Sequence, residues 1–220
     1  MEKLDIICID EDMLYEFIKL NLHSCRVSSR IIENSKYHHQ TKIERIPNML
    51  KNGILSKNKF SELKGRDLTD DEISIYSDDC HVNGTDYVSV SSMDLDFSTM
   101  GKDEYYWDPI DSLESGIVVS SDIRAFRVTK NYFNEFLVEG GIYPSSFSAI
   151  DTKVLKIYTN RFYRGEESKT DRMLRHYHTL KDIALSLKED NLDIPLREVS
   201  DEVITLDIDK VIKLPSLKLK

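Results

Sequence analysis

Cysteine is scarce in this chain, with three residues among 220. Cys8, Cys25 and Cys80 are odd in number and none belongs to a CxxC pair. This spacing argues against both a disulfide framework and a cysteine-based zinc site. We therefore expect a reducing, cytoplasmic setting.

Long apolar runs and glycine-rich signatures are also missing. No apolar stretch is long enough to cross a bilayer, and residues 1–5 lack the basic start and apolar run of a signal peptide. The chain contains no phosphate-binding or dinucleotide glycine pattern, no GxSxG elbow and no HExxH zinc motif. We expect no membrane partner and no nucleotide site of the common glycine-rich kinds.

What is present is typical of a soluble globular protein. Apolar residues make up 40% of the chain and charged residues 31%, enough for one domain with a sizeable core. The net charge of −9 weighs against broad electrostatic binding of nucleic acid. Positive charge gathers only between Arg161 and Arg175, so a local basic patch stays open.

Apolar periodicity predicts three helices. The first contains Met13 to Leu22 with Asp10 as a cap, and the second occupies 42–52 and ends at Asn52-Gly53. The third is an amphipathic helix over Asp171–Leu187. The tail after Ile194 is either a wrap against the core or a poorly ordered end.

Alternating and β-branched runs predict strands. They are expected at 86–92, 117–120, 132–138 and 149–158. Residues 56–83 read as an exposed, partly helical insert, and 93–116 as a long loop carrying Tyr105, Tyr106 and Trp107. That aromatic trio either packs the loop on the core or serves a ligand.

The histidines do not form a recognisable metal site. His38 and His39 are adjacent on an expected strand and point to opposite faces, while His176 and His178 are two apart on a helix and read as surface residues. We therefore predict no metal.

Three separated segments carry groups suited to one ligand. His39 and Thr41 can hydrogen-bond ribose hydroxyls or an amide, and a strand bearing Tyr87, Ser89 and Ser91 offers an aromatic ring and hydroxyls. Glu135 lies in an apolar run, where a carboxylate either points to solvent or steadies a cationic sugar centre.

These residues resemble motifs of the histidine–tyrosine–glutamate class of ADP-ribosyltransferases, which includes poly-ADP-ribose polymerases, DarT toxins and tRNA 2′-phosphotransferases. The segment from Tyr37 to Leu55, with His39-Gln40-Thr41 and Asn52-Gly53-Ile54-Leu55, resembles the first motif. Asp86–Ser91 is similar to the second motif, and Asn134–Val138 with Ile142-Tyr143-Pro144 resembles the third. The resemblance covers roughly residues 35–160.

The resemblance implies an α+β fold with a split, mostly antiparallel sheet and flanking helices. NAD would be the co-substrate, His39 and Thr41 would hold its ribose, and the backbone of Gln40, where many relatives have glycine, would meet the nicotinamide amide. Tyr87, or alternatively Tyr105 or Tyr106, would stack on a ring, with Ser89 beside it. Glu135 would be the catalytic carboxylate.

The implied domain occupies residues 1–160, and 161–220 would form a helix and tail packed on it. The expected activity transfers ADP-ribose to a macromolecule, with a protein acceptor mildly favoured over nucleic acid. An NAD hydrolase, an RNA 2′-phosphotransferase and a non-catalytic NAD- or partner-binding protein remain alternatives. For His39, the alternative role is a strand-end histidine bonded to backbone.

Overall fold

The computed structural model describes residues 6–27, 35–69, 86–92, 115–127, 135–160 and 167–220. Helical elements are α1 (Glu11–Ser24), η1 (Ile43–Arg45), α2 (Ile46–Asn52), α3 (Lys57–Lys64), η4 (Pro144–Ser146), α5 (Val154–Thr159), α6 (Lys169–Glu189) and α7 (Ile208–Ile212). Strands are β1 (Ile6–Ile9), β2 (Ser35–Thr41), β3 (Ile54–Leu55), β4 (Tyr87–Ser92), β5 (Ser115–Ser120), β6 (Ala125–Arg127), β7 (Glu135–Glu139), β8 (Gly141–Ile142), β9 (Phe147–Thr152), β10 (Leu196–Val199), β11 (Val203–Leu206) and β12 (Ser216–Leu219).

One eight-stranded sheet runs through the molecule in the order β11-β10-β9-β5-β2-β4-β7-β6. Its neighbouring strands are antiparallel except for β9 and β10. The predicted α+β class, with a mostly antiparallel sheet and flanking helices, is therefore confirmed. Near the middle, β2 and β4 pair only through Tyr37 with Ser92 and His38 with Ser91.

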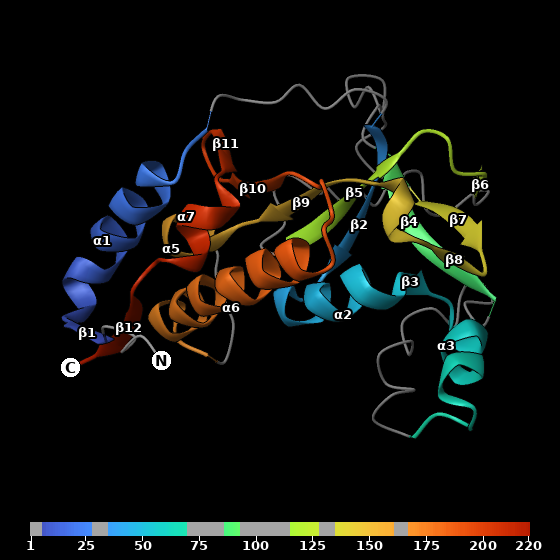
Figure 1. Cartoon of the computed structure of the whole chain (residues 1–220), viewed down its shortest axis with the longest axis horizontal. Coiled ribbons are helices and arrows are strands. Elements are labelled where there is room, and N and C mark those ends of the chain that lie inside the picture. The colour runs from blue at the N-terminus through green and yellow to red at the C-terminus, as the bar shows by residue number, and fades with distance from the viewer. Residues whose placement is uncertain (1–5, 28–34, 70–85, 93–114, 128–134, 161–166) are drawn as a thin grey trace, which may run out of the picture.

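The long helix α6 packs on one face of this sheet together with α2, as Figure 1 shows. Its core-facing side chains, including Met173, Tyr177 and Leu180, are fully buried. Ser168 caps the helix by accepting a hydrogen bond from the Asp171 backbone N–H (3.0 Å). The amphipathic helix predicted for this part of the chain is confirmed, as is the helix predicted between Met13 and Leu22.

The C-terminal segment is built into the same sheet. β10 lies beside β9, and β11 continues the sheet outward. β12 pairs in parallel with β1 in a separate two-stranded sheet, at the end of the molecule that holds α1 (Figure 1). The tail therefore wraps against the core.

The strand predicted over 149–158 is wrong in its second half. β9 ends at Thr152, and Val154 begins the short helix α5. The carboxylate of Glu198 on β10 accepts hydrogen bonds from the backbone N–H groups of Val154 (3.1 Å) and Leu155 (2.8 Å). This contact satisfies the free donors at the start of α5, and it comes from a residue far along the chain.

The surface position predicted for the α6 histidines is wrong for His176, which is buried at 2% exposure. His178 is half-buried, and its Nε2 accepts a hydrogen bond from the Leu217 backbone N–H (3.1 Å). The His178 ring therefore lies where α6 meets β12.

Several predicted features lie outside the described residues. They are most of the loop with Tyr105, Tyr106 and Trp107, the later part of the polar insert, and Arg161 and Arg164 of the basic cluster. Within the described part of the chain, no helix is both long and apolar enough to span a membrane.

Candidate functional site

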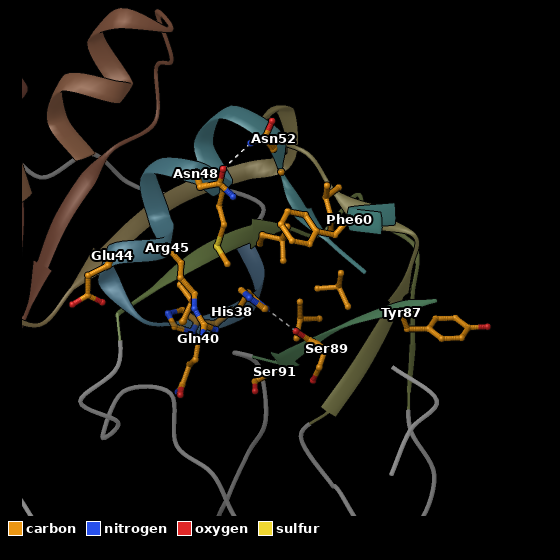
Figure 2. A pocket seen from close by; sticks show the side chains of 18 residues that line it. His38, Gln40, Glu44, Arg45, Asn48, Asn52, Phe60, Tyr87, Ser89 and Ser91 are labelled. Carbon is orange, nitrogen blue, oxygen red and sulfur yellow. Dashed lines mark hydrogen bonds between the residues drawn. The ribbon is translucent and has the colours of Figure 1, made fainter. Parts of the chain in front are cut away.

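A cavity of about 560 Å³ opens between α2 and β4, beside the end of β2 (Figure 2). This volume is within the range of small-molecule sites. The lining residues are His38, His39, Gln40, Thr41, Glu44, Arg45, Asn48, Met49, Asn52, Gly53, Ile54, Leu55, Phe60, Tyr87, Val88, Ser89, Val90 and Ser91. The cavity thus joins two segments that are far apart in the sequence.

The first wall follows from local sequence. β2 ends at Thr41, η1 turns the chain, and α2 begins with Pro47 in its first turn, where a missing N–H is tolerated. Gly53 ends the helix at a φ of +86°, and a Cβ there would lie 2.7 Å from the Ile142 carbonyl oxygen. Glycine therefore allows β3 to turn back and pair with β8.

The second wall is β4. Its side chains alternate between half-buried and buried along Tyr87–Ser92, as the predicted two-faced strand requires. Nδ1 of His39 donates a hydrogen bond to the Ser89 carbonyl oxygen (2.9 Å). This bond ties β2 to β4 close to where their ladder ends.

His39 is half-buried and uncharged near neutral pH. Burial lowers its pKa, and the positive charge of Arg45 lowers it further, against the opposing effect of the Ser89 hydrogen bond. Since a carbonyl oxygen only accepts, the proton sits on Nδ1 and leaves Nε2 as an acceptor. The ring can therefore receive a hydrogen bond from a hydroxyl while remaining bonded to backbone.

Two further side chains present unused polar atoms. The Thr41 hydroxyl and both amide atoms of Gln40 are buried and have no hydrogen-bond partner among the described residues. Buried polar groups normally find partners, so such atoms at a cavity wall suit a polar ligand.

The sequence-predicted ligand residues come together here, but not all face inward. His39, Gln40, Thr41, Tyr87 and Ser89 all contribute to the lining. Figure 2 shows the Tyr87 ring pointing away from the cavity and the Ser89 side chain directed to the other side of β4. In this arrangement Tyr87 offers no stacking surface inside the cavity.

Two cavity residues were missed by sequence reasoning. Phe60 of α3 points into the space from the side opposite β2, and Arg45 extends from the start of α2 toward Gln40 (Figure 2). Arg45, Asn48 and Asn52 recur at helical spacing as a polar stripe, a signal that could have revealed this face. Nothing in the pattern around Phe60 distinguishes it.

Glu135 begins β7, next to β4. Its backbone pairs with Ser91, which pairs in turn with His38, so the three residues form one row across adjacent strands. Ser91 and His38 both line the cavity. The side chain of Glu135 lies outside the described part of the structure.

His38 belongs to a different environment from His39. It is 3% exposed, and its Nε2 lies 3.8 Å from Oδ2 of Asp151, which Arg197 holds through two hydrogen bonds (2.6 and 2.8 Å). Burial lowers the pKa of His38 to about 4 despite the nearby carboxylate. Among the described residues, no three His, Cys, Asp or Glu side chains are grouped to hold a metal ion.

No protein-family model, curated protein or solved structure matches this chain. The assignment of a function therefore depends on the residues and geometry of the cavity.

Proposed function

We propose that this protein is an NAD-dependent ADP-ribosyltransferase with a split-sheet fold of that superfamily. The observation that carries the proposal is that two motif segments meet at one cavity. His39-Gln40-Thr41 at the end of β2 and Tyr87–Ser91 of β4 line the same space, and β7, with Glu135, is the next strand.

The cavity groups suit the nicotinamide nucleoside. The Nε2 lone pair of His39 accepts a hydrogen bond from a ribose hydroxyl, and Thr41 supports the same sugar. The chain at Gln40 meets the nicotinamide amide. All three groups lie within three consecutive residues of β2, so they are held by the ladder that β2 forms with β5.

The reaction breaks the bond between C1′ of the ribose and the nicotinamide nitrogen. The bonding electron pair leaves with nicotinamide, C1′ becomes cationic, and a lone pair of the acceptor forms the new bond as the acceptor loses a proton. In this proposal the Glu135 carboxylate orients the ribose and stabilises the positive charge at C1′.

The test is incubation of the purified protein with NAD, followed by assay of free nicotinamide. We expect release by the unaltered protein and loss of release in Glu135→Gln, with the fold retained. Glu139→Gln is the matched control, because it removes an exposed carboxylate from the same strand. Full activity of Glu135→Gln would rule out the assigned role.

Adding candidate acceptors then separates the alternatives. Radiolabelled ADP-ribose on a protein or nucleic acid supports transfer, with a protein acceptor expected first. Free ADP-ribose as the sole product indicates an NAD hydrolase. Binding of NAD without nicotinamide release indicates a non-catalytic module, and loss of a 2′-phosphate from RNA in the presence of NAD indicates the phosphotransferase.

A further inference from the structure

Charge is sparse in the cavity. Of the described residues that line it, only Glu44 and Arg45 carry a full charge at neutral pH, because burial keeps the pKa of His38 and His39 low. The part of the lining that the structure describes contains no lysine and no aspartate.

The two charges differ in their partners. Glu44 forms an ion pair with Arg175 of α6, which also holds Glu167 through two hydrogen bonds (3.1 and 2.6 Å). The backbone N–H of Arg45 donates to the Lys42 carbonyl oxygen (3.0 Å), but its guanidinium makes no ion pair or hydrogen bond with any residue that the structure describes. The Glu44 charge is therefore compensated within the protein, whereas the half-buried Arg45 charge has no compensating partner among the described residues.

The surroundings of Arg45 define what it can bind. Its side chain extends toward Gln40, whose amide has no partner among the described residues, and the buried Thr41 hydroxyl is likewise unpaired there (Figure 2). A guanidinium presents parallel N–H donors that match phosphate oxygens, and such charge-assisted bonds are stronger than neutral ones. A phosphate group is therefore the anion that the Arg45 guanidinium fits best, and Gln40 and Thr41 remain for the neighbouring sugar and base.

We propose that Arg45 is the phosphate anchor of the cavity and binds the pyrophosphate of the dinucleotide. This inference rests on the proposed function for the identity of the ligand. The anchor fixes the phosphates near the start of α2 and leaves the β2 end of the cavity for a nucleoside. Arg45 acts in binding and takes no part in bond breaking.

The experiment compares Arg45→Met with the unaltered protein and with Lys42→Met, by isothermal titration calorimetry with ADP-ribose. Methionine keeps most of the aliphatic length, and Lys42 is an exposed cation three residues away that does not line the cavity. We expect Arg45→Met to weaken ADP-ribose binding by roughly 10- to 100-fold. Lys42→Met should bind as the unaltered protein does, and Arg45→Lys should recover part of the loss.

Salt dependence gives a second readout. Binding of ADP-ribose by the unaltered protein should weaken between low and high salt, and this dependence should flatten in Arg45→Met. Thermal unfolding of each variant controls for a loss of fold. Equal affinity of Arg45→Met and the unaltered protein for ADP-ribose would overturn the anchor, as would equal losses in Arg45→Met and Lys42→Met.

The outcomes separate the two proposals. Arg45-dependent binding of ADP-ribose without nicotinamide release from NAD upholds the anchor and rejects the transferase. Nicotinamide release with an unchanged KM for NAD in Arg45→Met upholds the enzyme and rejects the anchor. A protein that binds no ADP-ribose at all refutes the anchor.

Discussion

A Cβ atom on Gly116 would lie 2.2 Å from Cε1 of His38, so the imidazole ring occupies the space that a side chain would need. Gly116 is on β5 and pairs with Gln40 on β2. The glycine therefore leaves room for the buried ring next to the neighbouring strand. His38 lines the cavity, and Gly116 lies on the strand next to it.

Replacing Gly116 with alanine should destabilise the fold. The added methyl group meets both the His38 ring and the His39 carbonyl oxygen, which is backbone and cannot swing away. Overpacking of this kind costs roughly 1–3 kcal/mol. Urea unfolding of Gly116→Ala against the unaltered protein measures the loss.

The double variant Gly116→Ala/His38→Ala tests whether a clash with the His38 ring causes the loss of stability. Removing the ring makes room for most of the methyl group, so the double variant should lose less stability than the sum of the single losses. Strict additivity would show that the ring is not what Gly116 accommodates.

His38 should make the fold sensitive to acid. Burial lowers its pKa from 6.5 to about 4, outweighing the attraction of Asp151 and aided by the positive charges of Lys153 and Arg197. An unfolded histidine takes up its proton near pH 6.5, so the unfolded state binds more protons between about 6.5 and 4. The contribution of His38 to the free energy of unfolding is therefore fully present above pH 6.5 and is lost as the pH falls toward 4.

The lowering of the His38 pKa corresponds to a difference of about 3 kcal/mol in the free energy of unfolding. Urea unfolding at several pH values should show the difference between the unaltered protein and His38→Ala shrinking by about that amount as the pH falls from about 7 to 4. The comparison cancels groups common to both proteins. A difference that stays constant with pH would contradict the assignment.

Glu198 should make the fold less stable as the pH rises, which is the opposite of the effect of His38. Burial raises its pKa to about 8, even though Leu155, Val154 and Thr152 donate hydrogen bonds to it. The folded state then holds the proton between its ordinary pKa of 4.5 and about 8. The contribution of Glu198 to the free energy of unfolding is therefore fully present below pH 4.5 and is lost as the pH rises toward 8.

Glutamine is the matched probe of that carboxyl, because it is neutral at every pH. Glu198→Gln should cost about 1–3 kcal/mol near pH 7, because its NH2 group cannot accept the hydrogen bond of one of the two backbone donors. Its stability relative to the unaltered protein should rise as the pH rises toward 8. Glu198→Ala leaves the donors at the start of α5 unsatisfied and should cost about 1–3 kcal/mol for each buried group. Urea unfolding of the three proteins at pH values from 5 to about 9 tests both statements. A stability difference between the Gln variant and the unaltered protein that stays constant over this pH range would show that Glu198 is ionised in the fold.

The parts of the fold that were predictable are those set by local patterns. α1, α2 and α6 follow apolar spacing, Gly53 ends α2 where the sequence indicates, and β4 alternates as expected. α5 was not predictable, because its buried residues Val154, Leu155 and Ile157 also suit a strand. Its donors are satisfied by Glu198, more than forty residues later in the chain.

The residues of the candidate site likewise divide into those that local sequence patterns predict and those that depend on tertiary contacts. His39, Gln40 and Thr41 belong to one local motif, and the alternation of β4 indicates which strand faces them. Phe60 and Arg45 become visible only once α2 and α3 are placed against β4. The helical spacing of Arg45, Asn48 and Asn52 indicates a polar face of α2 but not that this face lines a cavity, and nothing in the pattern around Phe60 distinguishes it.

Phe60 rather than Tyr87 should supply the aromatic surface of the cavity. The Phe60 ring points into the cavity, and the Tyr87 ring points away from it (Figure 2). If NAD binds as proposed, Phe60→Leu should weaken binding by a few fold to roughly tenfold, since ring contacts contribute about 0.5–1.5 kcal/mol beyond area. Tyr87→Leu, which removes an aromatic ring of similar size from β4, is the matched control and should leave affinity unchanged. Calorimetric titration of NAD into both variants, each carrying Glu135→Gln to prevent turnover, measures this. A larger loss in Tyr87→Leu would return the stacking role to the residue that the sequence motif indicates.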